Sequence, residues 1–115
     1  MSDPDCIFCK VVRRELPSEI VFENDELIAF NDIGAQAPTH LLIIPKTHIA
    51  TLNDLGAEHA DLVGRMVLKA RDLAAERGID DDGYRLVANC NAHGGQTVYH
   101  IHLHLLGGRQ LKALG

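Results

Sequence analysis

The chain has 115 residues, the size of one compact domain, and we therefore expect a single domain over residues 1–115. Eleven Lys and Arg residues against 16 Asp and Glu residues give a formal net charge of −5. This charge argues against a nucleic-acid-binding surface, because such a surface needs a basic field. The longest purely aliphatic run, residues 41–44, is far shorter than the ~20 residues of a membrane-spanning helix.

Histidine is the unusual feature of the composition, because seven His residues outnumber the three Phe and two Tyr residues together, and Trp is absent. Three Cys residues are an odd number and are too few for a secreted disulfide framework. Residues 1–5 are acidic and lack the basic and apolar regions of a signal peptide. The composition therefore predicts a cytoplasmic protein.

The first half of the chain predicts a short helix and three strands. Residues 6–14 are expected to form the short helix. Residues 19–31 read as a β-hairpin, because two apolar runs flank the turn-forming segment Glu-Asn-Asp-Glu at 23–26. A third strand is predicted over residues 41–44, and Pro45 ends it because proline has no N–H to donate.

The second half predicts one long helix followed by two strands. Apolar residues recur at three- and four-residue spacing over residues 57–77, as on one face of a helix, and Gly78 is the expected residue after its end. Strands are predicted over residues 84–89 and 99–106. The fold class is therefore α+β, with a five-stranded antiparallel sheet, one long helix and one short helix.

The last predicted strand carries the strongest functional signal. Residues 100–106 read His-Ile-His-Leu-His-Leu-Leu, so imidazole and aliphatic side chains alternate strictly. In a strand this period of two places His100, His102 and His104 on one face, with neighbouring Cα atoms ~6.5 Å apart. A sheet face that needed only polarity would normally use other residue types. The three imidazoles are therefore expected to share one ligand or one metal environment.

A glycine-rich turn stands just before the histidines. Residues 93–97 read His-Gly-Gly-Gln-Thr, and paired glycines let backbone N–H groups approach an anion closely. The Thr97 hydroxyl can donate to a phosphate or to a leaving-group oxygen. Such a turn is weak evidence by itself, but its position beside three imidazoles indicates a phosphate site next to a nucleophile.

The segment 100–106 resembles the His-φ-His-φ-His-φ-φ pattern (φ apolar) of the histidine triad (HIT) superfamily. Other segments are similar to its Hint branch, the histidine triad nucleotide-binding proteins, and the similarity extends from Cys6 to Gln110. Those segments are Phe-Asn-Asp-Ile at 30–33, Gln-Ala-Pro-Thr-His at 36–40, Ile-Pro-Lys at 44–46, Gly-Gln-Thr-Val-Tyr at 95–99 and Leu-Gly-Gly-Arg-Gln at 106–110.

The resemblance implies a nucleotidyl hydrolase that works through a covalent nucleotidyl-histidine. The matching nucleophile is His102, whose Nδ1–H is held in the family by a backbone carbonyl near the first histidine of the triad. His40 and His104 match residues that contact the phosphate, and Thr97 takes a position usually held by Ser. The resemblance thus assigns catalysis to His102, His40, His104 and Thr97.

The resemblance also implies a purine nucleotide site. Asp32 matches a carboxylate that accepts hydrogen bonds from the ribose hydroxyls, while Asn89 and the Gly95 amide match further phosphate contacts. Apolar residues match the walls of the purine slot, although by themselves they read as ordinary core residues. The complete expected nucleotide site is Asp32, Ile33, Phe8, Leu16, Phe30, Asn89, Gly95, Thr97, His102 and His104.

Cys6 and Cys9 form a Cys-x-x-Cys pair, which by itself is compatible with redox chemistry, with zinc binding or with neither. No strand is predicted before Cys6, which argues against a redox motif of the βαβ type. Zinc needs two further ligands. HIT proteins with this pair often bind zinc through two histidines that match His48 and His100, so the resemblance implies structural Zn²⁺ at these four residues.

The function that we expect is hydrolysis of the P–N bond in purine nucleoside 5′-phosphoramidates. Two alternatives remain open, namely a dinucleoside polyphosphate hydrolase and a nucleotide-binding regulatory module with weak catalysis. Asn89 argues against the first, because that branch of the superfamily usually has Gln at the matching position. The resemblance further implies a homodimer formed through the long helix and a neighbouring strand, and we expect neither nucleic acid nor a membrane as partner.

Overall fold

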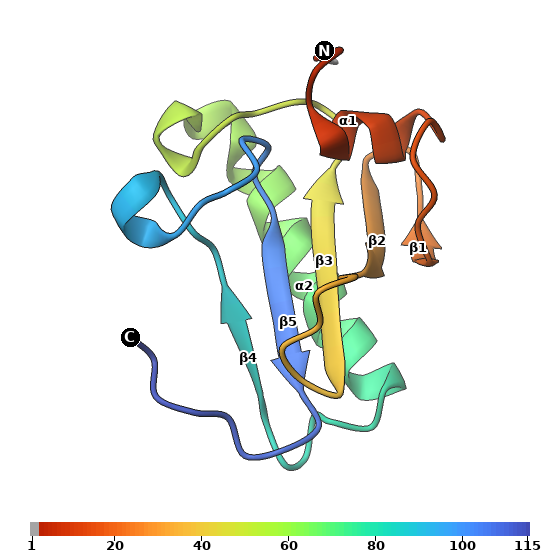
Figure 1. Ribbon diagram of the computed structural model, residues 1–115, viewed down its shortest axis with the longest axis vertical. Helices are drawn as coiled ribbons and strands as arrows, with labels where there is room; N and C mark the ends of the chain where they lie inside the picture. Colours follow the sequence, from red (N-terminus) through yellow and green to blue (C-terminus); the bar gives the residue numbers. More distant parts are fainter. Residues whose placement is uncertain (1–2) are drawn as a thin grey trace.

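The computed structural model describes residues 3–115, which form a five-stranded antiparallel sheet with strand order β1-β2-β3-β5-β4 (Figure 1). The expected α+β fold is confirmed. The strands are β1 (Ile20–Glu23), β2 (Leu27–Asn31), β3 (Thr39–Pro45), β4 (Tyr84–Val87) and β5 (Leu103–Gly107), and the α-helices are α1 (Ile7–Val12) and α2 (Ala60–Glu76).

The predicted hairpin is confirmed as β1 and β2, and the side chain of Asn24 organises its turn. The Asn24 Oδ1 accepts hydrogen bonds from the backbone N–H of Glu26 at 2.9 Å and of Leu27 at 2.7 Å. An Asn side chain that bonds the backbone two or three residues later is a standard turn device. The local sequence therefore determines where β2 begins.

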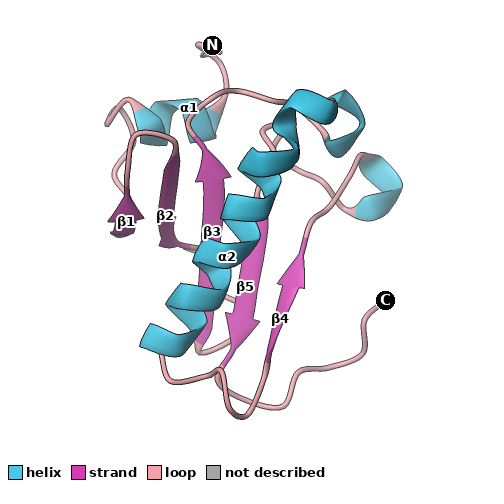
Figure 2. Cartoon of the chain, turned by 180° about the vertical axis from the view of Figure 1, so that it is seen from behind, coloured by secondary structure: helices cyan, strands magenta, loops and turns pink. Residues whose placement is uncertain are grey.

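The central strand β3 and its neighbour β2 are mostly apolar because helices cover both faces of the sheet. Leu27 and Ala29 face the long helix α2, which crosses the back of the sheet in Figure 1 and its front in Figure 2. Ile28 and Phe30, at the alternate positions, pack against residues of α1. Alternation along the strands therefore divides the core into two layers.

The long helix α2 begins at Ala60, three residues later than the predicted helix over residues 57–77. A 3-10 turn, Ala57–His59, precedes it, and the His59 Nδ1 accepts a hydrogen bond from the Gly56 N–H at 2.9 Å. Gly78 follows the end of α2 with a φ of +69°, as expected for a glycine in the left-handed region. Among the described residues, no helix has both the length and the hydropathy to cross a membrane.

Strand β5 begins at Leu103, so the prediction of a strand from residue 99 is wrong for its first four residues. The ladder between β3 and β5 ends at the pair of Ile43 and Leu103. The residues just before Leu103 bond to other parts of the chain instead. The carbonyl oxygen of Pro45 lies 2.7 Å from the His100 Nε2, and the Ile101 N–H donates to the Ile49 carbonyl at 2.7 Å. His100 and His102 therefore precede the ladder in a segment that long-range contacts hold.

The register of β3 and β5 brings the remaining histidines together. His104 lies opposite Leu42, and His40 lies opposite Leu106, two residues further along each strand. Because side chains two residues apart on β3 share a face, His40 and His104 both lie on the side of the sheet that α1 covers. This face holds the candidate site.

Candidate active site

A cavity of about 240 Å³ opens on the α1 side of the sheet. Its walls come from α1, from the loop before β1, from the end of β2 and from the segment before β5. The cavity is lined by Ile7, Phe8, Val11, Leu16, Pro17, Ser18, Phe30, Asn31, Asp32, Ile33, Leu42, Thr97, Val98, His102 and His104. A mostly apolar pocket with a few polar groups has the composition of a small-molecule site.

His102 is held with one ring nitrogen bonded and the other free. Its Nδ1 lies 2.8 Å from the carbonyl oxygen of His100. Because a carbonyl oxygen only accepts, Nδ1 carries the proton, and in the neutral ring Nε2 then keeps its lone pair. Among the described residues, no hydrogen bond engages the His102 Nε2. This tautomer is the one that a nucleophilic imidazole requires.

A second chain of contacts fixes the tautomers of His40 and His104. The backbone N–H of Gln36 donates to the His40 Nδ1 at 3.0 Å, so the proton of neutral His40 is on Nε2. The His40 Nε2 lies 2.9 Å from the His104 Nδ1 and donates to it. The His104 proton must then be on Nε2. A single backbone amide thus makes His104 a donor through Nε2, which suits contact with a phosphate oxygen.

Burial keeps these two imidazoles neutral near pH 7. Desolvation lowers the pKa of His104 to about 4, and the neighbouring His102 and His40 lower it further while Asp32 opposes the shift. Desolvation also lowers the pKa of His40, again opposed by the charge of Asp32. Neutral rings preserve the chain of tautomers that begins at Gln36.

Asp32 lies at the beginning of the loop that leads to His40. Its Oδ1 accepts a hydrogen bond from the Gly34 N–H at 2.8 Å, and its Oδ2 lies 3.4 Å from the His40 Nε2. The donor atoms of Asp32, His40 and His104 are also close enough to hold a metal ion. However, two nitrogens on one tetrahedral zinc are ~3.3 Å apart, and the 2.9 Å between His40 and His104 instead matches a hydrogen bond.

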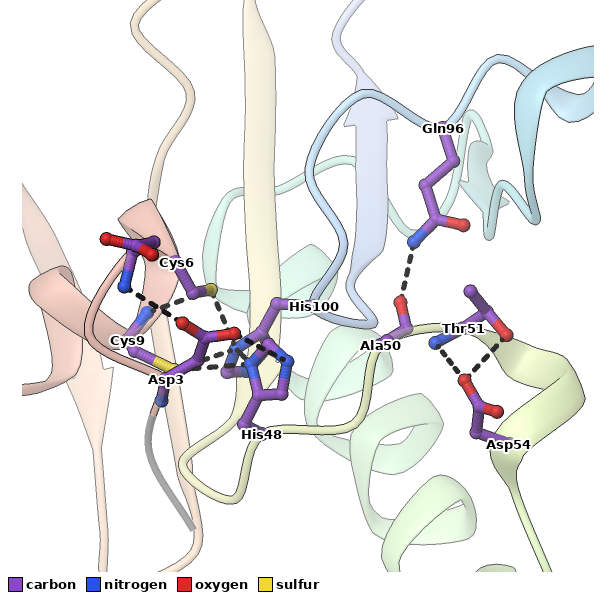
Figure 3. Close-up of polar contacts among 10 residues, drawn as sticks. Asp3, Cys6, Cys9, His48, Ala50, Thr51, Asp54, Gln96 and His100 are labelled. Atoms are coloured by element: carbon purple, nitrogen blue, oxygen red, sulfur yellow. Dashed lines mark hydrogen bonds and ion pairs between the residues drawn. The ribbon is translucent and has the colours of Figure 1, made fainter.

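A second cluster joins α1 to the segment before β5. The side-chain donor atoms of Cys6, Cys9, His48 and His100 all lie within 4.8 Å of one another, close enough to hold a metal ion (Figure 3). The His100 Nε2–H donates to the Pro45 carbonyl oxygen, which leaves the Nδ1 lone pair directed at the cluster. Burial lowers the pKa of His100 to about 4, so this ring is neutral, as a metal ligand must be.

Most of the expected nucleotide-site residues come together in the structure. Phe8, Leu16, Phe30, Asp32, Ile33, Thr97, His102 and His104 all line the cavity. Asn89 and Gly95 do not line it. The Asn89 amide instead donates to the Gly94 carbonyl oxygen at 2.6 Å, within the glycine-rich turn.

Sequence reasoning missed two glutamines that organise the site. Gln36 acts through its backbone, for which the sequence holds no signal. The buried Gln96 donates to the carbonyl oxygens of Ala50 and Val98 and accepts from the Asn91 N–H, so it ties the glycine-rich turn to the segment after β3 (Figure 3 shows its bond to Ala50). The position of Gln96 directly after Gly94 and Gly95 is the one feature of the sequence that could have indicated this role.

Known proteins resemble this chain over almost its whole length. Residues 5–113 match the family described as "Scavenger mRNA decapping enzyme C-term binding". The purine nucleoside phosphoramidase of Escherichia coli (strain K12) is 57% identical over 107 residues, which cover 93% of this chain and 90% of that protein.

Solved structures agree in fold. A HIT family hydrolase from Legionella pneumophila superposes with a TM-score of 0.92 at 54% identity, covering 94% of this chain and 96% of that one. A histidine triad protein from Clostridium difficile gives a TM-score of 0.95 at 40% identity and covers 100% of both chains. The fold and the site define a histidine triad protein of the Hint type. The chain belongs to the HIT superfamily, and the expected membership is confirmed.

The depressed pKa of His104 predicts how stability changes with pH. In the unfolded chain this imidazole titrates near 6.5, whereas in the folded protein its pKa is about 4. The unfolded state therefore binds more protons between these values, and folding stability falls as the pH is lowered from about 6.5 to about 4. We expect His104 to contribute about 2 kcal/mol to this loss.

Urea unfolding of the wild type and of His104→Gln at pH 7 and pH 4.5 measures this contribution. The variant should lose less stability on acidification, because its amide does not titrate. All other titrating groups are common to both proteins. An equal loss in the two proteins would show that His104 is not held neutral by the fold.

Proposed function

We propose that this enzyme hydrolyses the P–N bond of purine nucleoside 5′-phosphoramidates through a covalent nucleotidyl intermediate on His102. The observation that carries the proposal is the free Nε2 of His102 in a cavity with a mostly apolar lining. The 57% identity to a purine nucleoside phosphoramidase supports the choice of substrate class.

In the first step the His102 Nε2 lone pair attacks the α-phosphorus, a bond from Nε2 to phosphorus forms, and the bond from phosphorus to the amine breaks. The leaving nitrogen takes a proton from solvent and departs as the amine, and the water that attacks in the second step returns one proton to solvent. The Nδ1–H bond to the His100 carbonyl stabilises the positive charge that develops on the imidazole. Water then attacks phosphorus, releases the nucleoside monophosphate and restores His102.

The surrounding residues stabilise this transfer. The His104 Nε2–H donates to a phosphate oxygen, and His40 keeps that proton in place. The Thr97 hydroxyl, in the cavity lining, contacts the leaving group. Asp32 accepts hydrogen bonds from the ribose hydroxyls, while Phe8, Leu16, Phe30 and Ile33 surround the base. Asn89 and the Gly95 amide remain proposed as further phosphate contacts from the family resemblance; in the structure they lie outside the cavity lining and donate to the carbonyl oxygens of Gly94 and Ala92.

The cluster of Cys6, Cys9, His48 and His100 is proposed to hold a structural Zn²⁺. Around tetrahedral zinc, two imidazole nitrogens lie ~3.3 Å apart and a sulfur lies ~3.6 Å from a nitrogen. The His48 Nδ1 and His100 Nδ1 are 3.3 Å apart, and three sulfur-to-nitrogen distances, from Cys6 to His100 and from Cys9 to both histidines, are 3.3–3.5 Å. When bound, the ion braces α1 against the segment before β5. It supplies no chemistry to the reaction.

A cytoplasmic location is part of the proposal, since a thiolate metal site requires reduced cysteines. All three cysteines are free thiols. A homodimer is proposed because the solvent face of α2 presents the apolar residues Val67 and Leu68, which are 42% and 49% exposed. Strand β4 is an edge strand of the sheet. A second copy would cover both.

The reaction is tested with a panel of an adenosine 5′-phosphoramidate, a guanosine 5′-phosphoramidate and a diadenosine polyphosphate. We expect turnover of the phosphoramidates, and we expect His102→Ala to lower kcat by at least about 10³-fold because it removes the nucleophile. His59→Ala, at the start of α2, is the control and should retain the wild-type rate. A preference for the polyphosphate would indicate the alternative hydrolase, and tight nucleotide binding without turnover would indicate a binding module.

Metal content is tested on protein purified without chelator. We expect about one zinc ion per chain in the wild type and far less in Cys9→Ser, because three ligands hold zinc more weakly than four. Cys90→Ser is the matched control, since Cys90 lies outside the cluster, and should keep its zinc. Wild-type protein with much less than one zinc per chain would refute the site.

The dimer is tested by size-exclusion chromatography with light scattering. We expect the mass of two chains for the wild type and a shift toward one chain for Leu68→Glu, because a buried unpaired carboxylate opposes association. Leu114→Glu changes a residue that is 85% exposed and should remain dimeric. A monomeric wild type would contradict the proposal.

A further inference from the structure

The short helix α1 connects the metal-binding cluster to the nucleophile. Cys6 is the N-cap residue of α1 and Cys9 lies in its first turn, and both sulfurs belong to the cluster (Figure 3). Phe8 stands between them and is directed into the cavity wall. Its ring centroid lies 5.0 Å from that of His102, at an interplanar angle of 89°. One residue thus touches the catalytic imidazole from between two proposed metal ligands.

Helix α1 has only six residues, so contacts outside the helix must stabilise it. Helices shorter than ~12 residues are marginal in water by themselves. Two sets of contacts are available. One is the apolar cluster in which Phe8 and Val11 pack against β2 and β3. The other is the Cys–His cluster, whose partners His48 and His100 come from distant parts of the chain.

The imidazole of His102 needs more than its one hydrogen bond to be oriented. The bond from Nδ1 to the His100 carbonyl fixes one atom of the ring, and the ring can still tilt about it. Two rings limit this tilt. The ring of His104 lies on one side, with its centroid 5.0 Å from that of His102. The ring of Phe8 also lies against the His102 ring, in a T-shaped arrangement. T-shaped packing is a favoured geometry for aromatic rings.

We propose that Phe8 is a positioning residue for the His102 nucleophile, and that metal binding at Cys6, Cys9, His48 and His100 holds Phe8 in that position. The inference rests on the proposed function and extends it, because it makes the structural metal a determinant of the rate. Phe8 moves no proton and forms no bond with the substrate in this role. Its loss should therefore affect kcat more than KM.

The first test compares Phe8→Leu with Phe22→Leu in the metal-loaded protein. Leucine preserves an apolar cavity wall but removes the ring that limits the tilt of His102. Phe22 lies in the core layer on the α2 side and stacks with Lys69, so it is a matched control for the same chemical change. An aromatic pair of this kind is worth a rate change of about 2- to 10-fold.

We expect Phe8→Leu to lower kcat about 3- to 10-fold with KM changed less than about 2-fold, and Phe22→Leu to leave both unchanged. Nitrogen-15 NMR of the imidazole rings gives a second readout, without turnover. The His102 signals should show a protonated Nδ1 and a bare Nε2 in the wild type, and exchange broadening in Phe8→Leu. Unchanged kcat, a loss confined to KM, or an equal loss in Phe22→Leu would overturn the proposal.

The second test removes the metal by chelation and measures whether metal loss and Phe8→Leu have additive effects. We expect chelation to lower kcat and to broaden the His102 signals in the wild type, but to have less than a 2-fold further effect in Phe8→Leu. Such non-additivity marks a shared route. Equal effects of chelation in both proteins would overturn the link between metal and Phe8.

Circular dichroism shows whether the metal-free protein is folded. If it is unfolded, the variant His48→Asn replaces chelation, because it weakens metal binding but keeps three of the four proposed ligands. The NMR readout also separates this inference from the proposed function. Failure to hydrolyse phosphoramidates would refute the function, while the His102 signals would still report whether Phe8 and the metal position the ring.

Discussion

The hydrogen bond between the His102 Nδ1–H and the carbonyl oxygen of His100, 2.8 Å long, is the contact on which the rest of the site depends. It selects the tautomer that leaves Nε2 free, and it does so with a backbone group whose role as acceptor cannot change. The side chain of the same His100 lies in the Cys–His cluster and bonds the Pro45 carbonyl. His100 therefore holds the nucleophile through its backbone carbonyl, and it belongs through its ring to the Cys–His cluster that contacts α1.

Backbone groups also set the second half of the site. The Gln36 amide determines which nitrogen of His40 carries the proton, and His40 then determines the tautomer of His104. The position of Gln36 is itself braced, because Arg109 donates to its carbonyl oxygen at 2.7 Å from the turn after β5. With a net charge of −5, the protein offers no overall attraction for a phosphate. Oriented neutral donors supply that attraction locally.

Much of this could be predicted from the sequence, for physical reasons that differ between elements. The alternation of residues 100–106 and the Cys-x-x-Cys pair are local patterns, and the HIT resemblance extended them to a fold and a set of site residues. The start of β5 could not be predicted, because it depends on contacts from Ile101 to Ile49 and from His100 to Pro45. The tautomer chain could not be predicted either, since a backbone amide leaves no mark in the sequence. Asn89 and Gly95 match phosphate contacts of the family, yet they lie outside the cavity lining of this chain.

Covalent bonding of the His102 Nε2 to phosphorus is the step that the whole mechanism requires. Its most direct test is to mix the protein with an adenosine 5′-phosphoramidate, quench within the first turnover at alkaline pH, digest and map the adduct by mass spectrometry. We expect one adenylyl group on the peptide that contains residues 100–106, and we expect fragmentation to place it on His102. Turnover without any adduct, or an adduct on another residue, would contradict this mechanism.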